Sequence, residues 1–360
     1  MKKFIILLHL AFAGTAYSQY PRVDIPGSEV RKITSSIVAG QEYELHILLP
    51  GGYKTSTKRY PVVYLMDSQW DFPLVKSIYG EHYYDGFIPE MIIVGVTWGG
   101  TNANADSLRA RDYTPTKIDQ LPQSGGADKF LSFMKDELFP FMEKNYKADP
   151  VHRSLLGCSL GGLITLYAFL THTDMFIGYA AASPAVGWDN SVLTKYEQDF
   201  ANKKLDRPVR VYMTIGDVER SRPNYERIAN SFISKNYQNV SIRSKVLENT
   251  GHSGTKGETF ARGLQYIFEK RKFKLDDEAL NQLTGKYQLQ NGSSVELKNE
   301  NNQLVIYFSP TFKYELFAAS PTEFYSNSEF FNLYFKTNRG KVDGFDLARY
   351  NNTQFLKKVN

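Results

Sequence analysis

Residues 157–161, Gly-Cys-Ser-Leu-Gly, constrain the fold of this chain more than any other stretch. They stand where a short apolar run gives way to a segment of helical period, and Gly-x-Ser-x-Gly in that context is typical of a strained strand-to-helix turn. Gly157 and Gly161 are needed because unfavourable dihedral angles at Ser159 tolerate only small neighbours. The pattern therefore predicts that Ser159 projects above a sheet edge as a nucleophile, at a helix N-terminus that favours negative charge.

The chain around this turn alternates between strand and helix patterns. Residues 60–67 and 91–98 are continuous apolar runs rich in β-branched side chains, as expected of strands buried on both faces of a parallel sheet. The alternation predicts an α/β fold, a three-layer sandwich with a mostly parallel sheet and right-handed crossovers. Further strands are expected at 43–50, 153–157, 178–183, 209–216 and 241–248, and helices at 128–146, 162–170, 223–236 and 258–271.

The pattern changes after the last of these helices. Residues 274–285 predict a short helix ended by Gly285, and the short aromatic-rich strands that follow, with turns at Asn-Gly, Glu-Asn-Asn and Arg-Gly, predict a β-meander. This tail holds no histidine or cysteine, so we expect neither catalysis nor metal binding in it. We interpret its aromatic side chains as core, with a sugar-binding platform as the alternative. The expected division is a signal peptide at 1–18, a main domain at 19–274 and a small all-β domain at 283–360.

The first residues predict export. Lys2 and Lys3 precede an apolar stretch and then small residues, with Ala16 and Ser18 at the −3 and −1 positions of a cleavage site. The apolar stretch is too short to span a bilayer. We therefore expect cleavage after Ser18, no stable membrane insertion, and a secreted or periplasmic mature protein.

Charge and cysteine content argue against a nucleic-acid partner and an internal disulfide. Loss of the two leader lysines lowers the formal charge from +5 to +3, and the one short basic run, in residues 269–278, is followed by acids. We therefore expect no nucleic-acid partner. Cys158 is the only cysteine, so the protein holds together without an internal disulfide.

A serine nucleophile needs a base, and in folds with this turn the acid and the histidine follow the serine in chain order. Four of the six histidines precede Ser159 or leave with the leader, and a fifth follows it by only one helix: His9, His46, His82, His152 and His172. His252 remains. It lies between glycines in a loop after the last predicted strand of the main domain, which predicts that it is the general base.

The acid must lie between Ser159 and His252, on a loop that leaves a strand. The stretch at 209–221, VRVYMTIGDVERS, offers Asp217 and Glu219. The order of residues alone leaves both open.

Four further segments carry recognisable motifs: YPVVYLMDSQWDF at 60–72, RARDYTPT at 109–116, ASPAVGWDN at 182–190 and ENTGHSG at 248–254. Together with the serine turn they resemble the putative-esterase family of α/β-hydrolases, which includes enterobactin-type siderophore esterases, feruloyl esterases and S-formylglutathione hydrolases. The resemblance covers roughly residues 35–270. It implies a three-layer α/β-hydrolase fold and favours Glu219 as the acid, because the family's acid usually lies three residues beyond the strand-ending glycine, here Gly216. Asp217 is then expected to cap the turn.

The resemblance also implies two-step acyl transfer without a metal or an organic cofactor. His252 takes the proton of Ser159, the serine attacks an ester carbonyl, and water later releases the acid. The amide of Leu160 and one from Ser68 or Gln69 are the expected oxyanion donors. The chain departs from the family here, because Asp67-Ser68 stands where the family commonly has Asp-Gly, and this leaves the choice between Ser68 and Gln69 open.

Four side chains lie in segments expected around the pocket and are candidates to stack on or orient substrate, with buried packing as the alternative for the tryptophans: Trp70, Trp98, Arg111 and Trp188. Three functions stay open. The first is an exported esterase of siderophore-type lactones, favoured by segments 60–72 and 109–116. The others are a feruloyl or acetyl esterase acting on polysaccharide, and a catalytically silent binding protein on the same fold. The partner is then a small-molecule or glycan ester, and the oligomeric state stays open.

Overall fold

The structure is a computed structural model that describes residues 24–359 other than 102, 271, 350 and 351, so the predicted leader and its cleavage site lie outside the described residues. An eight-stranded sheet runs in the order β1-β2-β4-β3-β5-β6-β7-β8. The pairs β1–β2 and β2–β4 are antiparallel and every later neighbouring pair is parallel. The strands are β1 (Ser28–Thr34), β2 (Glu42–Leu48), β3 (Tyr60–Leu65), β4 (Ile92–Trp98), β5 (Ala148–Cys158), β6 (Gly178–Ala182), β7 (Val209–Gly216) and β8 (Val240–Leu247).

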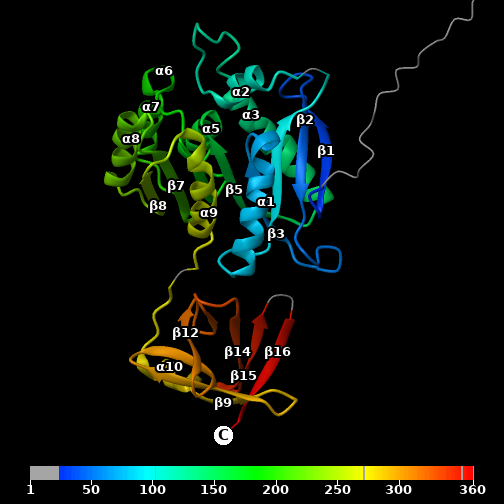
Figure 1. The fold of residues 1–360 in the computed structure, drawn as a ribbon, viewed down its shortest axis with the longest axis vertical. Helices are drawn as coiled ribbons and strands as arrows, with labels where there is room; N and C mark the ends of the chain where they lie inside the picture. The colour runs from blue at the N-terminus through cyan, green and yellow to red at the C-terminus, as the bar shows by residue number, and fades with distance from the viewer. Residues whose placement is uncertain (1–23, 102, 271, 350–351, 360) are drawn as a thin grey trace, which may run out of the picture.

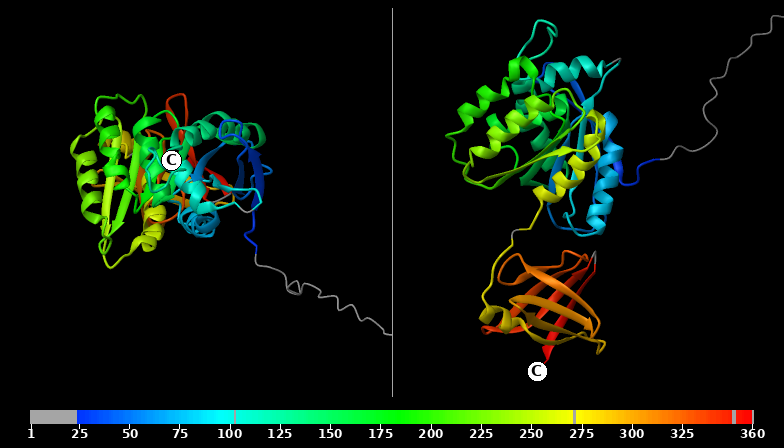
Figure 2. Two further views of the ribbon diagram at one scale, coloured as in Figure 1. Left: turned by 90° about the horizontal axis from the view of Figure 1, so that it is seen from above. Right: turned by 60° about the vertical axis from the view of Figure 1, so that its left-hand side comes forward.

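The sheet is buried on both faces, as the continuous apolar runs predict. Along β3, Val63 and Leu65 pack into the hydrophobic cluster with α1 and α9, whereas Val62 and Tyr64 pack into the cluster on the other face. Helices α1 and α9 cover the first face, and the remaining helices of this part of the chain cover the second (Figures 1 and 2). Each fully buried aliphatic side chain in these layers contributes about 1.5–3 kcal/mol of stability. The predicted three-layer arrangement is confirmed.

The four helices predicted by range differ from the observed ones mainly at their ends, whereas the helices at 105–113, 188–191 and 193–200 and the strand at 28–34 have no predicted counterpart. Predicted helix 128–146 is one continuous helical segment with a single π turn in its middle, and predicted helix 258–271 begins and ends earlier. The helical elements of the sheet-containing part are α1 (Ser68–Tyr84), α2 (Ala105–Tyr113), α3 (Ala127–Phe133), η1 (Met134–Leu138), α4 (Phe139–Asn145), α5 (Leu160–Thr171), α6 (Trp188–Ser191), α7 (Leu193–Phe200), α8 (Arg222–Ser234), η2 (His252–Gly254) and α9 (Thr255–Ile267).

The C-terminal part forms a closed antiparallel barrel with strand order β10-β11-β12-β13-β14-β15-β16-β9. Its hairpins use the predicted turn residues, since Arg339 and Gly340 both have positive φ, which matches the twist of the flanking strands. The elements are α10 (Asp277–Leu283), β9 (Gly285–Gln288), β10 (Ser294–Glu300), β11 (Gln303–Ser309), β12 (Phe312–Ala318), β13 (Glu323–Tyr325), β14 (Asn332–Asn338), β15 (Lys341–Arg349) and β16 (Asn352–Val359).

Five aromatic side chains of the barrel are buried in its interior. Tyr287, Phe324 and Phe345 are buried in one hydrophobic cluster, and the ring centroids of Tyr287 and Phe345 are 4.7 Å apart. The interpretation of these aromatics as core is therefore confirmed for the side chains in this cluster, while Phe312 and Tyr334 lie exposed.

The barrel contacts the end of α1 that is far from Ser68. The Phe330 ring packs edge-on against Tyr83 with centroids 5.7 Å apart, and Lys270 donates to Glu323 at 3.4 Å. A helix of 17 residues is about 25 Å long. The barrel therefore lies at the opposite end of α1 from the segment that carries Ser68 and Gln69 (Figure 1).

No helix among the described residues is long and apolar enough to cross a membrane.

Candidate active site

Ser159 occupies the tight turn between β5 and α5. Its φ of 60° and ψ of −117° are dihedral angles that residues with a side chain rarely adopt. Its amide donates to the carbonyl of Ala182 at 3.0 Å, and its carbonyl accepts from the amide of Ala185. A Cβ atom on Gly157 would lie 2.2 Å from the carbonyl oxygen of Gly161. Gly157 is therefore required because the strand and helix backbones approach too closely here for a side chain.

His252 and Glu219 lie in direct contact. His252 begins the short turn η2 after β8, and Glu219 lies three residues beyond Gly216 at the end of β7. The distance from His252 Nδ1 to Glu219 Oε2 is 2.7 Å. The imidazole is 50% exposed whereas the carboxylate is 7% exposed. The structure thus brings the predicted base and one of the two candidate acids together and leaves Nε2 of an accessible imidazole for proton transfer.

Two further groups bind the Glu219 carboxylate. Its Oε1 accepts from Ser183 Oγ at 2.5 Å and from the amide of Gly216 at 2.9 Å. Ser183 Oγ also lies 2.8 Å from Thr255 Oγ1, which donates to the carbonyl of His252. Burial alone would raise the pKa of Glu219, but the hydrogen bonds from Ser183, His252 and Gly216 outweigh it and hold the pKa below its usual range. The carboxylate is therefore held charged and oriented.

Asp217 has a different set of partners. Its Oδ1 accepts from the amide of Thr250 at 3.1 Å, and the backbone amides of Asn249 and Thr250 hold the pKa of this carboxyl below its ordinary value. Asp217 thus caps the loop that leads to His252, while Glu219 contacts the imidazole.

A short loop after β6 connects the serine turn to the acid. Ala182 and Ala185, which bond to the backbone of Ser159, flank Ser183, which bonds to Glu219. Because β5, β6, β7 and β8 are adjacent and parallel, the residues that follow them meet at one edge of the sheet. Strand order thus brings together side chains that are far apart in the sequence.

The predicted oxyanion donors are backbone amides at two helix N-termini. Around the first turn of α1, the amide of Asp67 donates to Tyr113 Oη, and those of Trp70 and Asp71 donate to the carbonyl of Asp67. Within the described residues, the amides of Ser68, Gln69 and Leu160 have no hydrogen-bond acceptor, which leaves them available as the predicted oxyanion donors. Whether Ser68 or Gln69 supplies the second donor stays a prediction.

Two buried ion pairs hold the segment that carries Ser68 and Gln69. Arg109 binds both oxygens of Asp67 at 2.7 and 2.9 Å, and Lys256 of α9 binds Asp71 at 2.6 Å. Burial raises the pKa of Asp67, and the neighbouring cations oppose part of that rise. The second pair joins α1 to the helix that directly follows the histidine turn.

Trp70 and Trp188 lie at different depths. Trp70 is 50% exposed, and the Arg109 guanidinium lies 5.2 Å from the centroid of its ring. Trp188 is half-buried, and its indole N–H donates to Thr116, so it joins segments 182–190 and 109–116. Contact of either tryptophan with substrate stays a prediction, and of the two, Trp70 is the more exposed.

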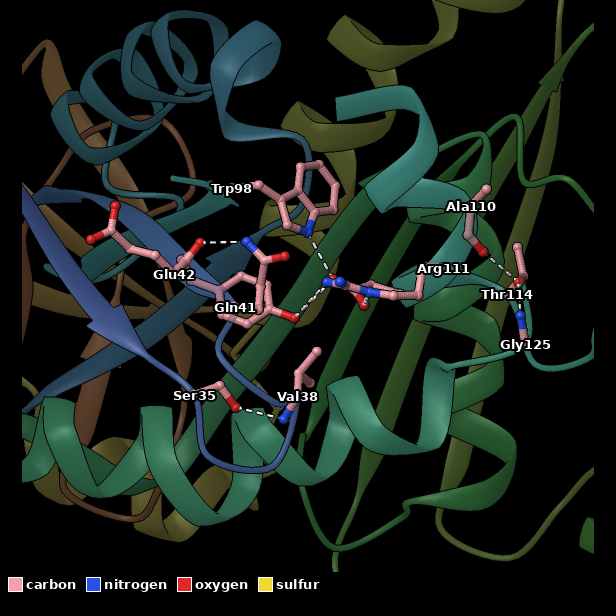
Figure 3. A network of polar contacts seen from close by, with 11 residues as sticks. Ser35, Val38, Gln41, Glu42, Trp98, Ala110, Arg111, Thr114 and Gly125 are labelled. Carbon is pink, nitrogen blue, oxygen red and sulfur yellow. Dashed lines mark hydrogen bonds and ion pairs between the residues drawn. The ribbon is translucent and has the colours of Figure 1, made fainter. Parts of the chain in front are cut away.

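Trp98 and Arg111 are bound within a polar network (Figure 3). Trp98 is 7% exposed and its indole N–H donates to Asp112 at 2.7 Å, as does the Tyr43 hydroxyl at 2.8 Å. Arg111 binds both oxygens of the same buried carboxylate. Thr114 closes this region by donating to the carbonyl of Ala110. Trp98 and Arg111, which both bind Asp112, therefore brace segment 109–116. For both, a role in substrate contact stays a prediction.

Cys158 directly precedes Ser159 but packs into the fold. It is 3% exposed within the cluster beneath α1 and α9, and burial raises the pKa of its thiol to about 12. We expect Cys158→Ala to retain most activity and the native enzyme to resist iodoacetamide, because a buried, protonated thiol is a poor nucleophile. Loss of activity measured over hours with iodoacetamide tests this, and rapid inactivation that the alanine variant escapes would contradict it.

Sequence reasoning missed the residues that hold the site together. Ser183 and Thr255 orient Glu219 and His252, and Arg109 and Lys256 anchor the first turn of α1. Ser183 lies within segment 182–190, and that segment's resemblance to the family was the available signal.

A separate hollow of about 610 Å³ lies between α9 and the barrel and is lined by residues that include Arg243, Arg262, Tyr266 and Tyr325. None of the candidate catalytic residues lines it. Among the described residues, no group of three or more histidine, cysteine, aspartate or glutamate side chains is arranged to hold a metal ion.

The sheet order, the two helical layers and the turn at Ser159 define the class of this fold, an α/β-hydrolase. The sequence matches the model of the putative-esterase family over residues 35–261. The chain therefore belongs to this family, and it is an esterase.

Three relatives illustrate the similarity. The ferri-bacillibactin esterase BesA of Bacillus subtilis is 32% identical over 229 residues, which cover 57% of this chain and 78% of BesA. The crystal structure of the BES protein from Bacillus cereus has 26% identity and a TM-score of 0.62, covering 70% of this chain and 98% of that chain. An endo-1,4-beta-xylanase/feruloyl esterase of Xylanibacter ruminicola is 30% identical over 172 residues, covering 44% of this chain and 22% of that protein.

Proposed function

We propose that this esterase is exported and hydrolyses siderophore-type lactones or esters with Ser159 as nucleophile, His252 as general base and Glu219 as the orienting acid. The observation that carries the proposal is the 2.7 Å contact of His252 with Glu219 at the sheet edge where the turn at Ser159 lies. This is the arrangement that activates a serine hydroxyl at neutral pH.

The reaction proceeds in two steps. In the first, His252 Nε2 takes the hydroxyl proton of Ser159 as its Oγ attacks the ester carbonyl, and the imidazolium then protonates the leaving alcohol. In the second, water attacks the acyl-enzyme with the same base, and Ser159 recovers its proton as the carboxylic acid leaves. Glu219 stabilises the imidazolium in both steps without being protonated itself.

Negative charge on the carbonyl oxygen is stabilised by free amides. The amide of Leu160 opens α5, and those of Ser68 and Gln69 open α1, so two helix N-termini act on the same oxygen. Removing one such donor in serine hydrolases lowers kcat by about 10²–10³-fold. Catalysis by these residues needs no metal.

The substrate class follows from the relatives and from the rim of the site. The name of BesA assigns that relative a ferric siderophore as substrate. In this chain the exposed Trp70 ring, backed by Arg109, lies next to the candidate oxyanion residues and suits an aromatic, electron-rich group. Feruloyl or acetyl esters of polysaccharide are the second candidate, supported by the similarity to a feruloyl esterase.

A hydrolysis screen tests the substrate class. We expect kcat/KM for a catecholate trilactone to exceed that for feruloyl sugars and acetylated glycans by at least about tenfold, since differential binding of the transition state sets this ratio. A p-nitrophenyl ester serves as the general control, and Ser159→Ala as the blank. A preference for feruloyl sugars would establish the second candidate instead.

A covalent fluorophosphonate probe separates the enzyme from a catalytically silent binding protein. We expect labelling of the native chain and none of Ser159→Ala, because only an activated serine reacts. Export rests on the leader at 1–18, and N-terminal sequencing of the exported protein tests cleavage after Ser18.

A further inference from the structure

A second serine and histidine lie in contact outside the group formed by Ser159, His252 and Glu219. Ser68 Oγ is 2.8 Å from His46 Nδ1, and His46 Nε2 is 3.2 Å from Glu44 Oε1. Ser68 opens α1, whereas His46 and Glu44 lie two residues apart on β2 and so share one face of that strand. A hydrogen-bonded chain therefore links the first turn of α1 to the sheet.

The neighbouring strand leaves room for this contact. His46 pairs with Gly95 of β4, and a Cβ atom at Gly95 would lie 2.0 Å from Ser68 Oγ. The same atom would lie 3.1 Å from the ring of Phe72, which packs at 5.5 Å from the imidazole. Any side chain at Gly95 would displace Ser68 from His46, so the sheet has a gap where the contact forms.

The arrangement is not a second nucleophilic site. The Ser68 side chain lies against Gly95 and Phe72 and is bound to His46, so its hydroxyl is closed to substrate. Because the Glu44 carboxylate can only accept, the neutral imidazole that satisfies both contacts carries its proton on Nε2 and accepts the Ser68 hydroxyl at Nδ1. The hydroxyl is thus fixed in one orientation.

The contact between Ser68 and His46 holds the first turn of α1, which carries the unbonded amides. Of the amides from Asp67 to Asp71, those of Ser68 and Gln69 have no hydrogen-bond acceptor among the described residues. Asp67 has a left-handed φ of 56° and sets the path of the chain into α1. The residue that follows this aspartate is a serine whose side chain is tied to the sheet through His46.

We propose that His46 and Glu44 are positioning residues that hold Ser68, and with it the amides of Ser68 and Gln69, in place as oxyanion donors. The proposal rests on the proposed serine-esterase function. It gives a positioning role to His46, which chain order excludes as the general base. The side-chain hydrogen bond of Ser68 fixes the backbone at the start of α1, so the donors are oriented before substrate binds.

The test separates positioning from general stability. His46→Phe keeps a ring of similar size but removes the acceptor, and Ser68→Ala removes the donor with less change in volume. We expect each to lower kcat on an accepted ester by about tenfold and to leave KM within about twofold, as loss of an interaction made only in the transition state does. A phenylboronic acid, which forms a tetrahedral adduct on the nucleophile, should bind about tenfold more weakly to both.

Two further variants sharpen the result. His46→Asn places a carboxamide oxygen near the position of Nδ1, and we expect it to restore kcat to within about threefold of the native value. Glu42→Gln changes a carboxylate on the same face of β2 that binds Lys32 rather than His46, and we expect native kinetics.

The proposal is overturned if Ser68→Ala, which is the variant least expected to disturb folding, has native kcat and native boronic acid affinity. A loss carried by KM alone, or an equal loss in Glu42→Gln, overturns it as well. Failure of the proposed function is distinct, because Ser159→Ala would then keep its turnover whatever the His46 variants do.

Discussion

Replacing Ser159 by alanine should lower turnover of every accepted ester by about 10⁶-fold, the loss seen when a triad that acts as one unit is broken. In the proposed mechanism the strained turn that holds Ser159, the amide of Leu160 and the contact of His252 with Glu219 act together on one nucleophile. Residual hydrolysis then comes from the oxyanion donors and substrate binding alone. The measurement is kcat on a p-nitrophenyl ester, with fluorophosphonate labelling of the same samples.

Ser253 provides a matched control. It is an exposed serine next to His252 in the turn η2, and we expect Ser253→Ala to keep native turnover and labelling. Near-native activity in Ser159→Ala, with the fold verified by circular dichroism, would refute the mechanism.

Replacing Glu219 by glutamine should lower kcat by about 10²–10⁴-fold while leaving KM nearly unchanged. Glutamine keeps the shape but presents a neutral group to His252 Nδ1, so the imidazolium formed during reaction loses its charged partner. Asp217→Asn should have a much smaller effect, because Asp217 bonds to the backbone of Thr250. The two variants are compared in steady-state kinetics at equal folded concentration. A larger loss in Asp217→Asn would reverse the assignment of the acid.

The pH dependence of the stability difference between the native protein and Glu219→Gln follows from the lowered pKa of Glu219. A carboxyl group whose pKa is lower in the folded state than in the unfolded state adds stability above its unfolded pKa. That stability is lost as the pH falls through the folded pKa. Glu219 should therefore contribute fully at neutral pH, and its contribution should disappear only in acid, below the usual range of a glutamate. Thermal unfolding profiles of native protein and Glu219→Gln should differ at neutral pH and converge in acid.

The sequence was sufficient for features that depend on local pattern. The buried strands at 60–67 and 91–98 follow from continuous apolar runs, and the turn at Ser159 follows from glycines at fixed offsets in a strand-to-helix context. Chain order singled out His252 because it constrains which histidine reaches the sheet edge. These inferences need no knowledge of which strands are neighbours.

The contacts that orient the candidate site depend on strand neighbours and could not be predicted. Ser183 reaches Glu219 because β6 and β7 are adjacent, and Ser68 reaches His46 because a glycine of β4 lies between them. The indole of Trp98 bonds to Asp112, a partner that no spacing rule indicates. The same residue types brace a site and contact substrate, so only their contacts in the folded structure show which role a side chain has.

The buried position of Cys158 has a consequence for how the chain reaches its native state. With one thiol, enclosed by β5 and the helices α1 and α9, the described fold has no covalent crosslink that must form or be rearranged. Folding is then independent of oxidants and of disulfide isomerases, and the same native state is accessible under reducing and oxidising conditions. Thiol reductants added during purification should leave the enzyme unaltered.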